Sequence, residues 1–338
     1  MTIAEELGAR GAALRVGALA LAGGAILAPM SGVSDLGMRR AARRFGAALA
    51  FSEMVASAEL VAENGEARLR AEGEGAEPHA AQLVGSEPGA MAEAARRLEA
   101  SGARLIDINM GCPSRRVAGR AAGCALMRDL DQASRLIEAV AVAVATPVSV
   151  KMRLGWDDDE RNASTLARRA EAAGAAMITV HGRTRRQLYD GHADWRAVGE
   201  VVAAVGVPVV VNGDCRGADD ARVMLAQSGA RAVMIGRAAV GAPWLVGGIG
   251  RALIAGGPAE EPPAAERRDA ALAHVEWLLT ALGRRAGLRH ARKHLAAYSE
   301  KAGAPDAVRR ALVTTEDADE ALRLLALAFA PQRQREAA

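Results

Sequence analysis

Short apolar runs alternate with amphipathic segments from about residue 24 to residue 250. The apolar runs are rich in Val, Ile, Leu and Ala and are too short for helices, so they predict buried strands. The segments between them carry apolar residues three and four positions apart, as at Leu130, Ala133 and Ile137, which predicts helices with one buried face. Eight strands are predicted in this way, at residues 25–30, 49–54, 80–85, 105–110, 148–153, 177–182, 208–213 and 232–237.

Eight strands that alternate with helices over this length predict a (β/α)8 TIM barrel, which we place at residues 21–250. A doubly wound open sheet uses the same strand–helix units and is the alternative. That fold often carries a Gly-x-Gly-x-x-Gly turn after its first strand, and the stretch after residue 30 lacks this pattern. The predicted fold class is therefore α/β, with the barrel as the main domain.

The chain changes character after the barrel. Residues 251–267 are rich in Gly, Pro, Ala and charged side chains, which predicts a linker. Leu272, Val275 and Leu279 then recur at helical spacing, so residues 268–330 are predicted to form a small all-α helical domain. Residues 1–20 and 331–338 are assigned as terminal tails.

An apolar run at residues 16–28 superficially resembles a secretory signal peptide. Glu5 and Glu6 are at odds with the basic leader of such peptides, and the run continues into LAPMSGVSD, which looks like a strand and its turn. The sequence contains no apolar segment as long as a bilayer requires. We therefore predict a cytoplasmic protein without a membrane segment.

Composition limits the other classes of protein. The chain has three cysteines, an odd and sparse set that is typical of a reducing compartment rather than of a disulfide framework. Their spacing matches no zinc-binding pattern, so no metal centre is predicted. The formal net charge is only +3, so a polyanionic partner would have to bind local basic patches.

Lysine is rare in this chain. Only Lys151, Lys293 and Lys301 are lysine among 43 basic residues, and the others are arginine. A lysine kept in so arginine-rich a chain indicates a position where a planar guanidinium cannot replace a compact ammonium.

Polar residues gather at the carboxyl ends of the predicted strands, where TIM barrels build their active sites. Scattered surface polarity would not recur at one end of apolar strands, so one site at the barrel mouth is predicted. These positions are Pro29, Met30, Ser31, Glu53, Gln82, Asn109, Cys112, Lys151, Arg153, His181, Asn212, Gly213, Gly236 and Arg237.

The last two strands end in glycine turns, NGD at residues 212–214 and IGR at residues 235–237. Backbone N–H groups at such turns can approach an anion, and barrels often bind phosphate after the seventh and eighth strands. A single Asn-Gly could be an ordinary turn, but two glycine turns at these positions favour a phosphate site.

The sequence leaves more than one role open for Lys151 and for His181. Lys151 interrupts an apolar strand, where it could pair with a structural carboxylate, form a Schiff base, or stand as a cation beside a cofactor that gains negative charge. His181 ends another strand at the level of Lys151, which favours a ligand contact over a purely structural role. Composition alone does not choose among these roles.

Cys112 lies between an apolar strand and a basic, glycine-spaced loop, in the stretch DINMGCPSRRVAGRAAG at residues 107–123. A packing cysteine would lie among aliphatic residues, and Cys112 does not; Cys124 and Cys215 are predicted to be packing cysteines. Free thiols have a pKa near 8.5, so a thiol here would be protonated at neutral pH and able to donate a proton.

The assembled motifs resemble those of the tRNA-dihydrouridine synthases. They cover about residues 24 to 245 in order, and ARKHLAAY at residues 291–298 resembles the helical RNA-binding domain of that family. The set looks closest to the bacterial B-type subfamily, although Ala297 stands where the family often has an aromatic residue. The motifs are APMSGVSD, FSEM, QLVG, DINMGCPS, GCALM, VKMR, VHGRTR, a following Tyr-Asp-Gly, VNGD and MIGRAAVGAPW.

The resemblance implies an enzyme that holds FMN and uses NADPH to reduce the C5–C6 double bond of particular uridines in tRNA. Cys112 matches the catalytic acid that protonates C5 after hydride from flavin N5 reaches C6. Asn109 and Arg153 are implied uracil contacts. The residues implied to bind the cofactor are Pro29, Met30, Ser31, Gln82, Lys151, His181, Asn212, Gly213, Asp214, Gly236 and Arg237.

The implied partner is tRNA, whose target base must be swung out of the folded RNA to reach the flavin. Phosphate contacts would supply most of the affinity. Arg183, Arg292, Lys293 and His294 are the predicted RNA contacts, with further arginines in the Cys112 loop and around residues 284–289. The subfamily resemblance points to a D-loop uridine, at position 17. A monomer is expected, although no sequence feature bears on the oligomeric state.

Two other functions remain open from the sequence. A free-pyrimidine oxidoreductase that resembles dihydroorotate dehydrogenase would share FMN and the barrel, but it would not need a basic helical domain. A catalytically silent RNA-binding protein would not need Cys112, Lys151 and His181 together.

Overall fold

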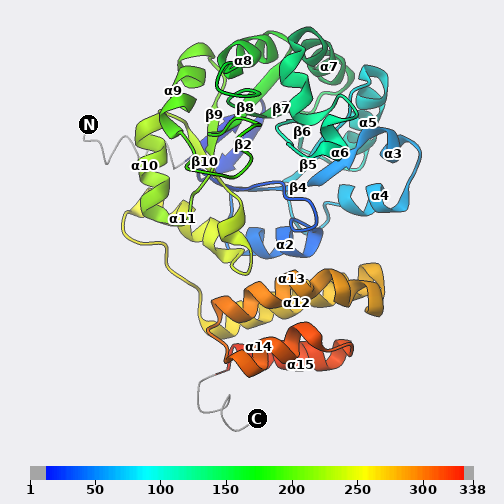
Figure 1. Cartoon of the computed structure of the whole chain (residues 1–338), viewed down its shortest axis with the longest axis vertical. Coiled ribbons are helices and arrows are strands. Elements are labelled where there is room, and N and C mark those ends of the chain that lie inside the picture. Colours follow the sequence, from blue (N-terminus) through cyan, green and yellow to red (C-terminus); the bar gives the residue numbers. More distant parts are fainter. Residues whose placement is uncertain (1–12, 331–338) are drawn as a thin grey trace.

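The computed structural model describes residues 13–330, in which eight parallel strands close into a barrel (Figure 1). The strand order is β10-β3-β4-β5-β6-β7-β8-β9, and β10 closes the barrel by pairing with β3. This closure confirms the TIM barrel and excludes the open sheet. The strands are β3 (Ala25–Leu27), β4 (Leu49–Ala56), β5 (His79–Val84), β6 (Leu105–Met110), β7 (Val148–Arg153), β8 (Ala175–His181), β9 (Val209–Asn212) and β10 (Ala232–Ile235).

Helices cover the outside of the barrel, so its strands are buried on both faces and read as continuous apolar runs. On α7 the residues Leu136, Ile137 and Val140 are buried, as the helical spacing predicted. The helices are α2 (Leu36–Arg44), α3 (Ser57–Val61), α4 (Gly65–Ala71), α5 (Pro88–Ala100), α6 (Arg115–Ala118), α7 (Leu130–Ala143), α8 (Ala163–Ala172), α9 (Trp195–Ala204), α10 (Ala218–Ser228) and α11 (Trp244–Ala255), with the 3₁₀ turns η1 (Gly123–Arg128) and η2 (Arg237–Ala239).

A short antiparallel hairpin of β1 (Ala13–Val16) and β2 (Leu19–Ala22) closes the amino-terminal end of the barrel. Leu14 and Val16 are buried in one apolar cluster with the first residues of several barrel strands. The predicted tail at residues 1–20 is therefore wrong from residue 13 onward. Alternate apolar residues in an alanine-rich run specify strands here, and the run at residues 16–28 supplies β2 and β3.

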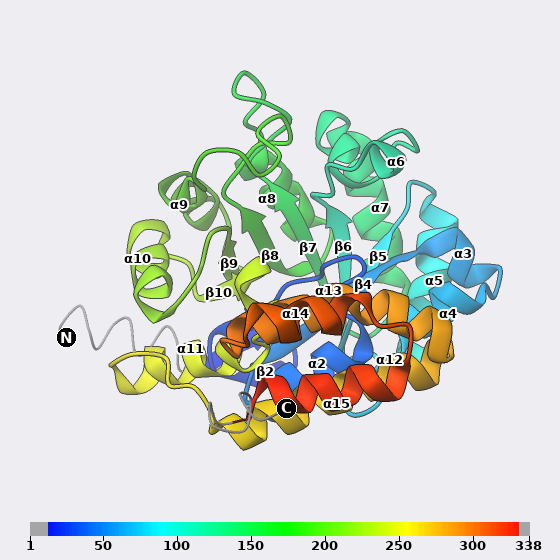
Figure 2. The ribbon, with the colours of Figure 1, turned by 60° about the horizontal axis from the view of Figure 1, so that its bottom comes forward.

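The predicted helical domain consists of α12 (Ala264–Leu282), α13 (Arg284–Lys301), α14 (Asp306–Thr314) and α15 (Ala318–Ala328). These helices lie beside α2, with α12 packed against it (Figures 1 and 2). The linker is shorter than the predicted 251–267, because α11 continues to Ala255 and α12 begins at Ala264. Burial of Ala252 and Leu253 extends α11, so only residues 256–263 connect the two domains.

The two domains share an apolar core. Phe45 and Trp244 of the barrel pack with Val275, Leu295 and Tyr298 of the helical domain in a single buried cluster. The helical domain is therefore fixed to the barrel by packing as well as by the chain. The predicted tail at residues 331–338 lies outside the described residues, and between residues 13 and 330 no helix is long and apolar enough to cross a membrane.

Candidate active site

The predicted site residues lie together at the carboxyl ends of the barrel strands. Lateral strand register places Asn109 beside Lys151, and it aligns Arg153, His181 and Asn212 across β7, β8 and β9. Pro29, Met30 and Ser31 form the loop after β3, and Gly236 follows β10. This ring of polar positions agrees with the site that the sequence predicted at the barrel mouth.

Side-chain amides line one wall of this site. Asn109 Nδ2 donates to Gln82 Oε1 at 2.8 Å, and Gln82 Nε2 donates to Asp107 Oδ2 at 2.7 Å. Asn109 Oδ1 accepts from the backbone N–H groups of Cys112 at 2.9 Å and Gly111 at 3.2 Å. The cysteine loop is thus tied to the barrel interior, and one hydrogen of Asn109 Nδ2 is already used.

Cys112 is half-buried and follows β6 directly. Its carbonyl accepts from Cys124 N at 3.2 Å, where the chain returns from the basic loop. Gly123 permits this return, because its φ is +61° and an added Cβ would lie 3.0 Å from the Cys112 carbonyl oxygen. Cys124 and Cys215 are buried, as expected for packing residues.

Positive charge dominates the mouth. Burial lowers the pKa of Lys151 to about 8, helped by Arg153, while Asp107 opposes this shift. Among residues 13–330, the Lys151 ammonium forms neither a hydrogen bond nor an ion pair. The structural ion pair considered for Lys151 is therefore not formed in the described chain, and the ammonium is left to meet a ligand.

His181 is neutral in this surrounding. Burial, followed by the charges of Lys151, Arg153, Arg183 and Arg237, holds the pKa of His181 well below its ordinary value. Arg183 Nη1 lies 3.3 Å from His181 Nε2, and a guanidinium can only donate. His181 Nε2 is therefore an acceptor, and the ring proton lies on Nδ1.

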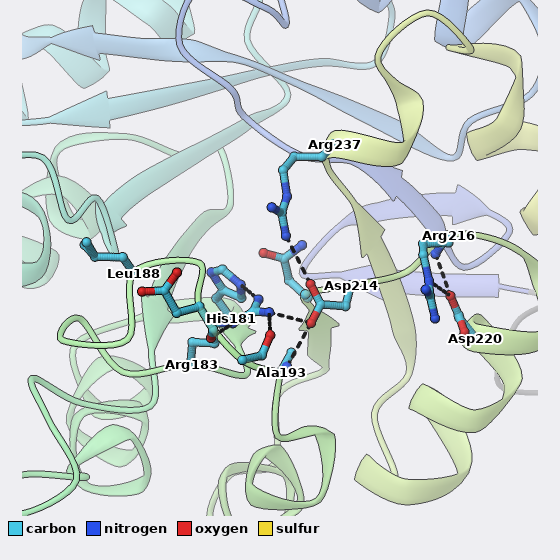
Figure 3. Close-up of polar contacts among 12 residues, drawn as sticks. His181, Arg183, Leu188, Ala193, Asp214, Arg216, Asp220 and Arg237 are labelled. Carbon is cyan, nitrogen blue, oxygen red and sulfur yellow. Dashed lines mark hydrogen bonds and ion pairs between the residues drawn. The ribbon is translucent and has the colours of Figure 1, made fainter. Parts of the chain in front are cut away.

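Asp214 organises the end of the site where the phosphate was predicted (Figure 3). Its carboxylate accepts from Arg183 at 2.6 Å, from the backbone N–H of Ala193 at 2.8 Å and from Arg237 at 3.1 Å. A direct contact of Asp214 with a phosphate would bring two anions together. Asp214 is instead placed to hold Arg237, whose side chain is 64% exposed.

The two glycine turns differ in how closely they are packed. Gly213 has a φ of +120°, and an added Cβ would lie 2.9 Å from His181 Cδ2, so only glycine fits there. At Gly236 an added Cβ would lie 3.8 Å from Ala28 Cβ and from Met30 Sδ, which is ordinary van der Waals contact. Asn212 is less available, because its Nδ2 donates to the Met234 carbonyl at 2.8 Å.

Two of the predicted RNA contacts are wrong. Arg183 is only 1% exposed, because its guanidinium is enclosed by His181, Asp214 and the loop carbonyls of Asp190 and Gly191. His294 is also only 1% exposed and belongs to the domain junction. A basic motif on a helix does not reveal which of its residues face the partner domain.

Of the other predicted contacts, Arg292 and Lys293 remain accessible, whereas Arg153 is buried. Lys293 is exposed on α13, and an added Cβ at Gly32 would lie 3.0 Å from its Nζ, so the ammonium lies over the loop after β3. Arg292 is half-buried beside it. Arg153 is 2% exposed and donates to the carbonyls of Gly111, Thr184 and Leu188, so it braces two loops of the mouth.

Sequence reasoning assigned no role to Tyr189 and gave Glu53 only a position at the barrel mouth. Tyr189 is 54% exposed, and its ring lies 5.5 Å from the Arg153 guanidinium and 5.2 Å from that of Arg237. Tyr189 belongs to the Tyr-Asp-Gly motif of the family resemblance, for which no function was predicted. Glu53 Oε1 accepts from Gly32 N at 2.5 Å and so holds the loop after β3. Its position at a strand end was the signal.

Asp35 joins this loop to the helical domain. Its Oδ1 caps α2 by accepting from Met38 N at 3.0 Å, and its Oδ2 lies 3.1 Å from His274 Nε2 on α12. His274 Nδ1 lies 2.9 Å from the Tyr298 hydroxyl, and His294 Nε2 lies 3.4 Å from Asp35 Oδ2. A buried polar network therefore holds the two domains together.

Within residues 13–330, Asp35, His274 and His294 also form a group whose ligand atoms lie close enough to hold a metal ion. The absence of a metal centre stays a prediction. Hydrogen bonds join Asp35 to Met38 and His274 and join His274 to Tyr298, while His294 Nε2 lies 3.4 Å from Asp35 Oδ2 without a hydrogen bond.

The junction should weaken in acid. Burial, with the nearby His274, lowers the pKa of His294 to about 4, and the two histidines hold the pKa of Asp35 below its ordinary value. A histidine with a lowered pKa takes up its proton more readily when unfolded, so stability falls as the pH drops from 6.5 towards 4. We expect His294→Gln to flatten the pH dependence of the free energy of unfolding in this window, by up to about 1.4 kcal/mol per pH unit, and with it the pH dependence of the melting temperature.

His290→Gln is the matched control, since His290 is exposed on the same helix. Melting temperatures of the wild type and both variants, measured between pH 4 and 7, check the prediction. Equal slopes for His294→Gln and the wild type would contradict it.

The comparisons with known proteins agree with the site. Residues 26–334 match the family model described as Dihydrouridine synthase (Dus). The chain is 50% identical over 315 residues to the "Probable tRNA-dihydrouridine synthase" of Rhodobacter capsulatus, covering 93% of this chain and 96% of the relative. It is 43% identical to the "tRNA-dihydrouridine synthase B" of Xanthomonas axonopodis pv. citri, covering 85% of this chain and 87% of the relative.

Among solved structures, morphinone reductase is similar with a TM-score of 0.54 at 16% identity, covering 75% of this chain and 91% of that chain. At this identity the similarity supports the barrel fold alone. The family follows from the sequence matches, which span nearly the whole chain. The chain belongs to the dihydrouridine synthase family.

Proposed function

We propose that this protein is a tRNA-dihydrouridine synthase that reduces the C5–C6 double bond of a D-loop uridine, with FMN as cofactor and NADPH as reductant. The observation that carries the proposal is the position of Cys112, a half-buried thiol at the carboxyl end of β6, near the half-buried cation Lys151. Family membership supports the substrate, and the chemistry of the site supports the reaction.

The residues at the mouth fit FMN. Lys151 is a cation without a partner in the described chain, and His181 is surrounded by four positive side chains while Asp214 and Asp107 supply the nearby carboxylates. Such a site suits an anionic ligand. Arg237 and the glycine turn at Gly236 would hold the phosphate, with Lys151, Gln82 and neutral His181 at the polar edge of the ring and Met30 against its face. Bound flavin supplies hydride.

Cys112 would supply the proton. Reduction of the double bond adds hydride at C6 and requires a proton at C5, and a protonated thiol can act as the general acid. The backbone N–H of Cys112 donates to Asn109 Oδ1, and the Cys112 carbonyl accepts from Cys124 N. These two hydrogen bonds fix the backbone that carries the thiol at the barrel mouth. Anchoring of this kind reduces the entropy lost when the uracil and the acid meet.

The exposed basic residues suit a folded RNA. Arg115, Arg116 and Arg120 are exposed in the Cys112 loop, and Arg289 and Lys293 are exposed on α13. Phosphate contacts at both places would hold the tRNA while the target base is swung into the mouth. A free-pyrimidine oxidoreductase would not need this surface. Three free cysteines suit the cytoplasm, and we propose that the enzyme acts there as a monomer.

The proposal is tested by mapping dihydrouridine in tRNA from cells with and without the gene. We expect one D-loop position, 17 by the subfamily resemblance, to lose the modification in the deletion and to regain it with the wild-type gene. The purified protein with FMN and NADPH should modify an unmodified tRNA transcript. Reduction of free pyrimidines with an unchanged tRNA would instead favour the free-pyrimidine enzyme.

A further inference from the structure

We propose that Asp107 is a positioning residue, which supplies the acceptor at the inner end of a hydrogen-bond relay through Gln82 and Asn109 to the backbone of Cys112. The inference rests on the proposed function, because it gives the relay the task of holding the catalytic acid. Asp107 itself lies inside the barrel and is only 1% exposed.

The direction of the relay is set at its outer end by the backbone. The N–H groups of Gly111 and Cys112 can only donate, so the atom of Asn109 that faces them must be Oδ1. Asn109 then presents Nδ2 to Gln82, and Gln82 must present Oε1 in return. Both amides are therefore oriented by their partners.

Asp107 satisfies the same direction at the inner end. Gln82 presents Nε2 to Asp107, and Oδ2 accepts from it at 2.7 Å. Ser149 Oγ donates to the other oxygen, Oδ1, at 2.6 Å. A donor at the position of Oδ2 would face the amide hydrogens of Gln82, and either the pair would separate or both amides would rotate.

Rotation of both amides would release the cysteine loop. Asn109 would then turn Nδ2 towards the N–H groups of Gly111 and Cys112, which places donors against donors. Loss of these two bonds would free the backbone on which the thiol is carried. Because Gln82 lies on the wall predicted to contact the flavin, the relay also sets the thiol relative to that wall.

The relay requires only one acceptor oxygen from Asp107. Burial raises the pKa of Asp107 to about 7, so near neutral pH part of the population carries a proton. A proton on Oδ1 would face the Ser149 hydroxyl, which can accept, while Oδ2 still accepts from Gln82. The relay therefore keeps its direction in both protonation states, and Asp107→Asn can imitate the neutral acid.

The test compares Asp107→Asn, which keeps an acceptor towards Gln82, with Asp107→Leu, which removes it. In the purified enzyme without tRNA, amide hydrogen exchange at Gly111 and Cys112 should be about tenfold faster or more in Asp107→Leu and near the wild type in Asp107→Asn. Dihydrouridine formation should fall by about 10- to 100-fold in Asp107→Leu alone. Ser149→Ala is the matched control, since it touches the same carboxylate outside the relay, and it should change neither readout.

A double-mutant cycle separates positioning from general destabilisation. If Asp107 acts through Asn109, then adding Asp107→Leu to Asn109→Leu should cause no further loss in rate or in exchange protection. Additive losses, or unchanged exchange in Asp107→Leu, would overturn the inference. Should Asp107→Leu fail to fold, Gln82→Met interrupts the same relay one link further along and takes its place. A wild type inactive on tRNA would refute the proposed function instead, and the exchange measurement would still decide the relay.

Discussion

Replacing Cys112 with alanine should abolish dihydrouridine formation while flavin content and NADPH oxidation stay close to those of the wild type. The variant lacks the proton that C5 requires, and loss of a general acid costs about 100-fold or more in rate. The Cys112 side chain is half-buried in a loop whose anchors are backbone atoms, so its removal leaves the fold and the flavin wall in place. Single-turnover reduction of tRNA by the prereduced enzyme measures the effect.

Cys215→Ala is the control for this experiment. Cys215 is a buried cysteine of the same barrel, but its thiol meets the Gly217 carbonyl at 3.7 Å and has no place in the proposed reaction. It should turn over at the wild-type rate. A Cys112→Ala enzyme that also reduces tRNA at the wild-type rate would refute the assignment of Cys112 as the acid.

Lys151→Met should slow reduction of the bound flavin by NADPH by about 100-fold, the size of effect expected when one preorganised positive group is removed from a catalytic site. Lys151 has no partner in the described chain, and burial already lowers its pKa to about 8. Its charge is therefore available to the anion that forms on the cofactor. Stopped-flow absorbance of the flavin measures the rate.

Lys151→Arg should also be impaired, although it keeps the charge. A guanidinium is planar and larger than an ammonium, and the space inside the mouth is already occupied by Arg153, Arg183 and Arg237. Lys301→Arg, at the end of α13, provides a control far from the barrel mouth. Flavin reduction at the wild-type rate in Lys151→Arg would contradict the argument from the rarity of lysine.

The junction of Asp35 with the helical domain changes how that domain is understood. Asp35 ends the loop that begins with Pro29 and Met30, and Ser34 of the same loop accepts from Met30 N at 2.8 Å. His274 of α12 and His294 of α13 therefore contact Asp35, at the end of the loop predicted to line the flavin. Together with the shared apolar cluster, this contact fixes the helical domain against the loop after β3.

The sequence by itself determined the eight strands, the barrel and most of the positions at its mouth. It could do so because strand and helix periodicity is local, and because barrel topology brings every strand end to one face. Gln82, Asn109, Lys151 and His181 were found from strand ends alone. The hairpin at residues 13–22 was missed, since alternation is hard to see in a run composed almost entirely of alanine and leucine.

Only the tertiary structure decided which polar groups meet one another. Arg183 and His294 have the sequence surroundings of exposed RNA contacts, yet Asp214 and Asp35 draw them into buried networks from strands and helices distant in the chain. The role of Asp107 likewise depends on partners that lie 25 and 42 residues away. Hydrogen-bond direction and burial are properties of contacts between elements, so local patterns in a sequence do not carry them.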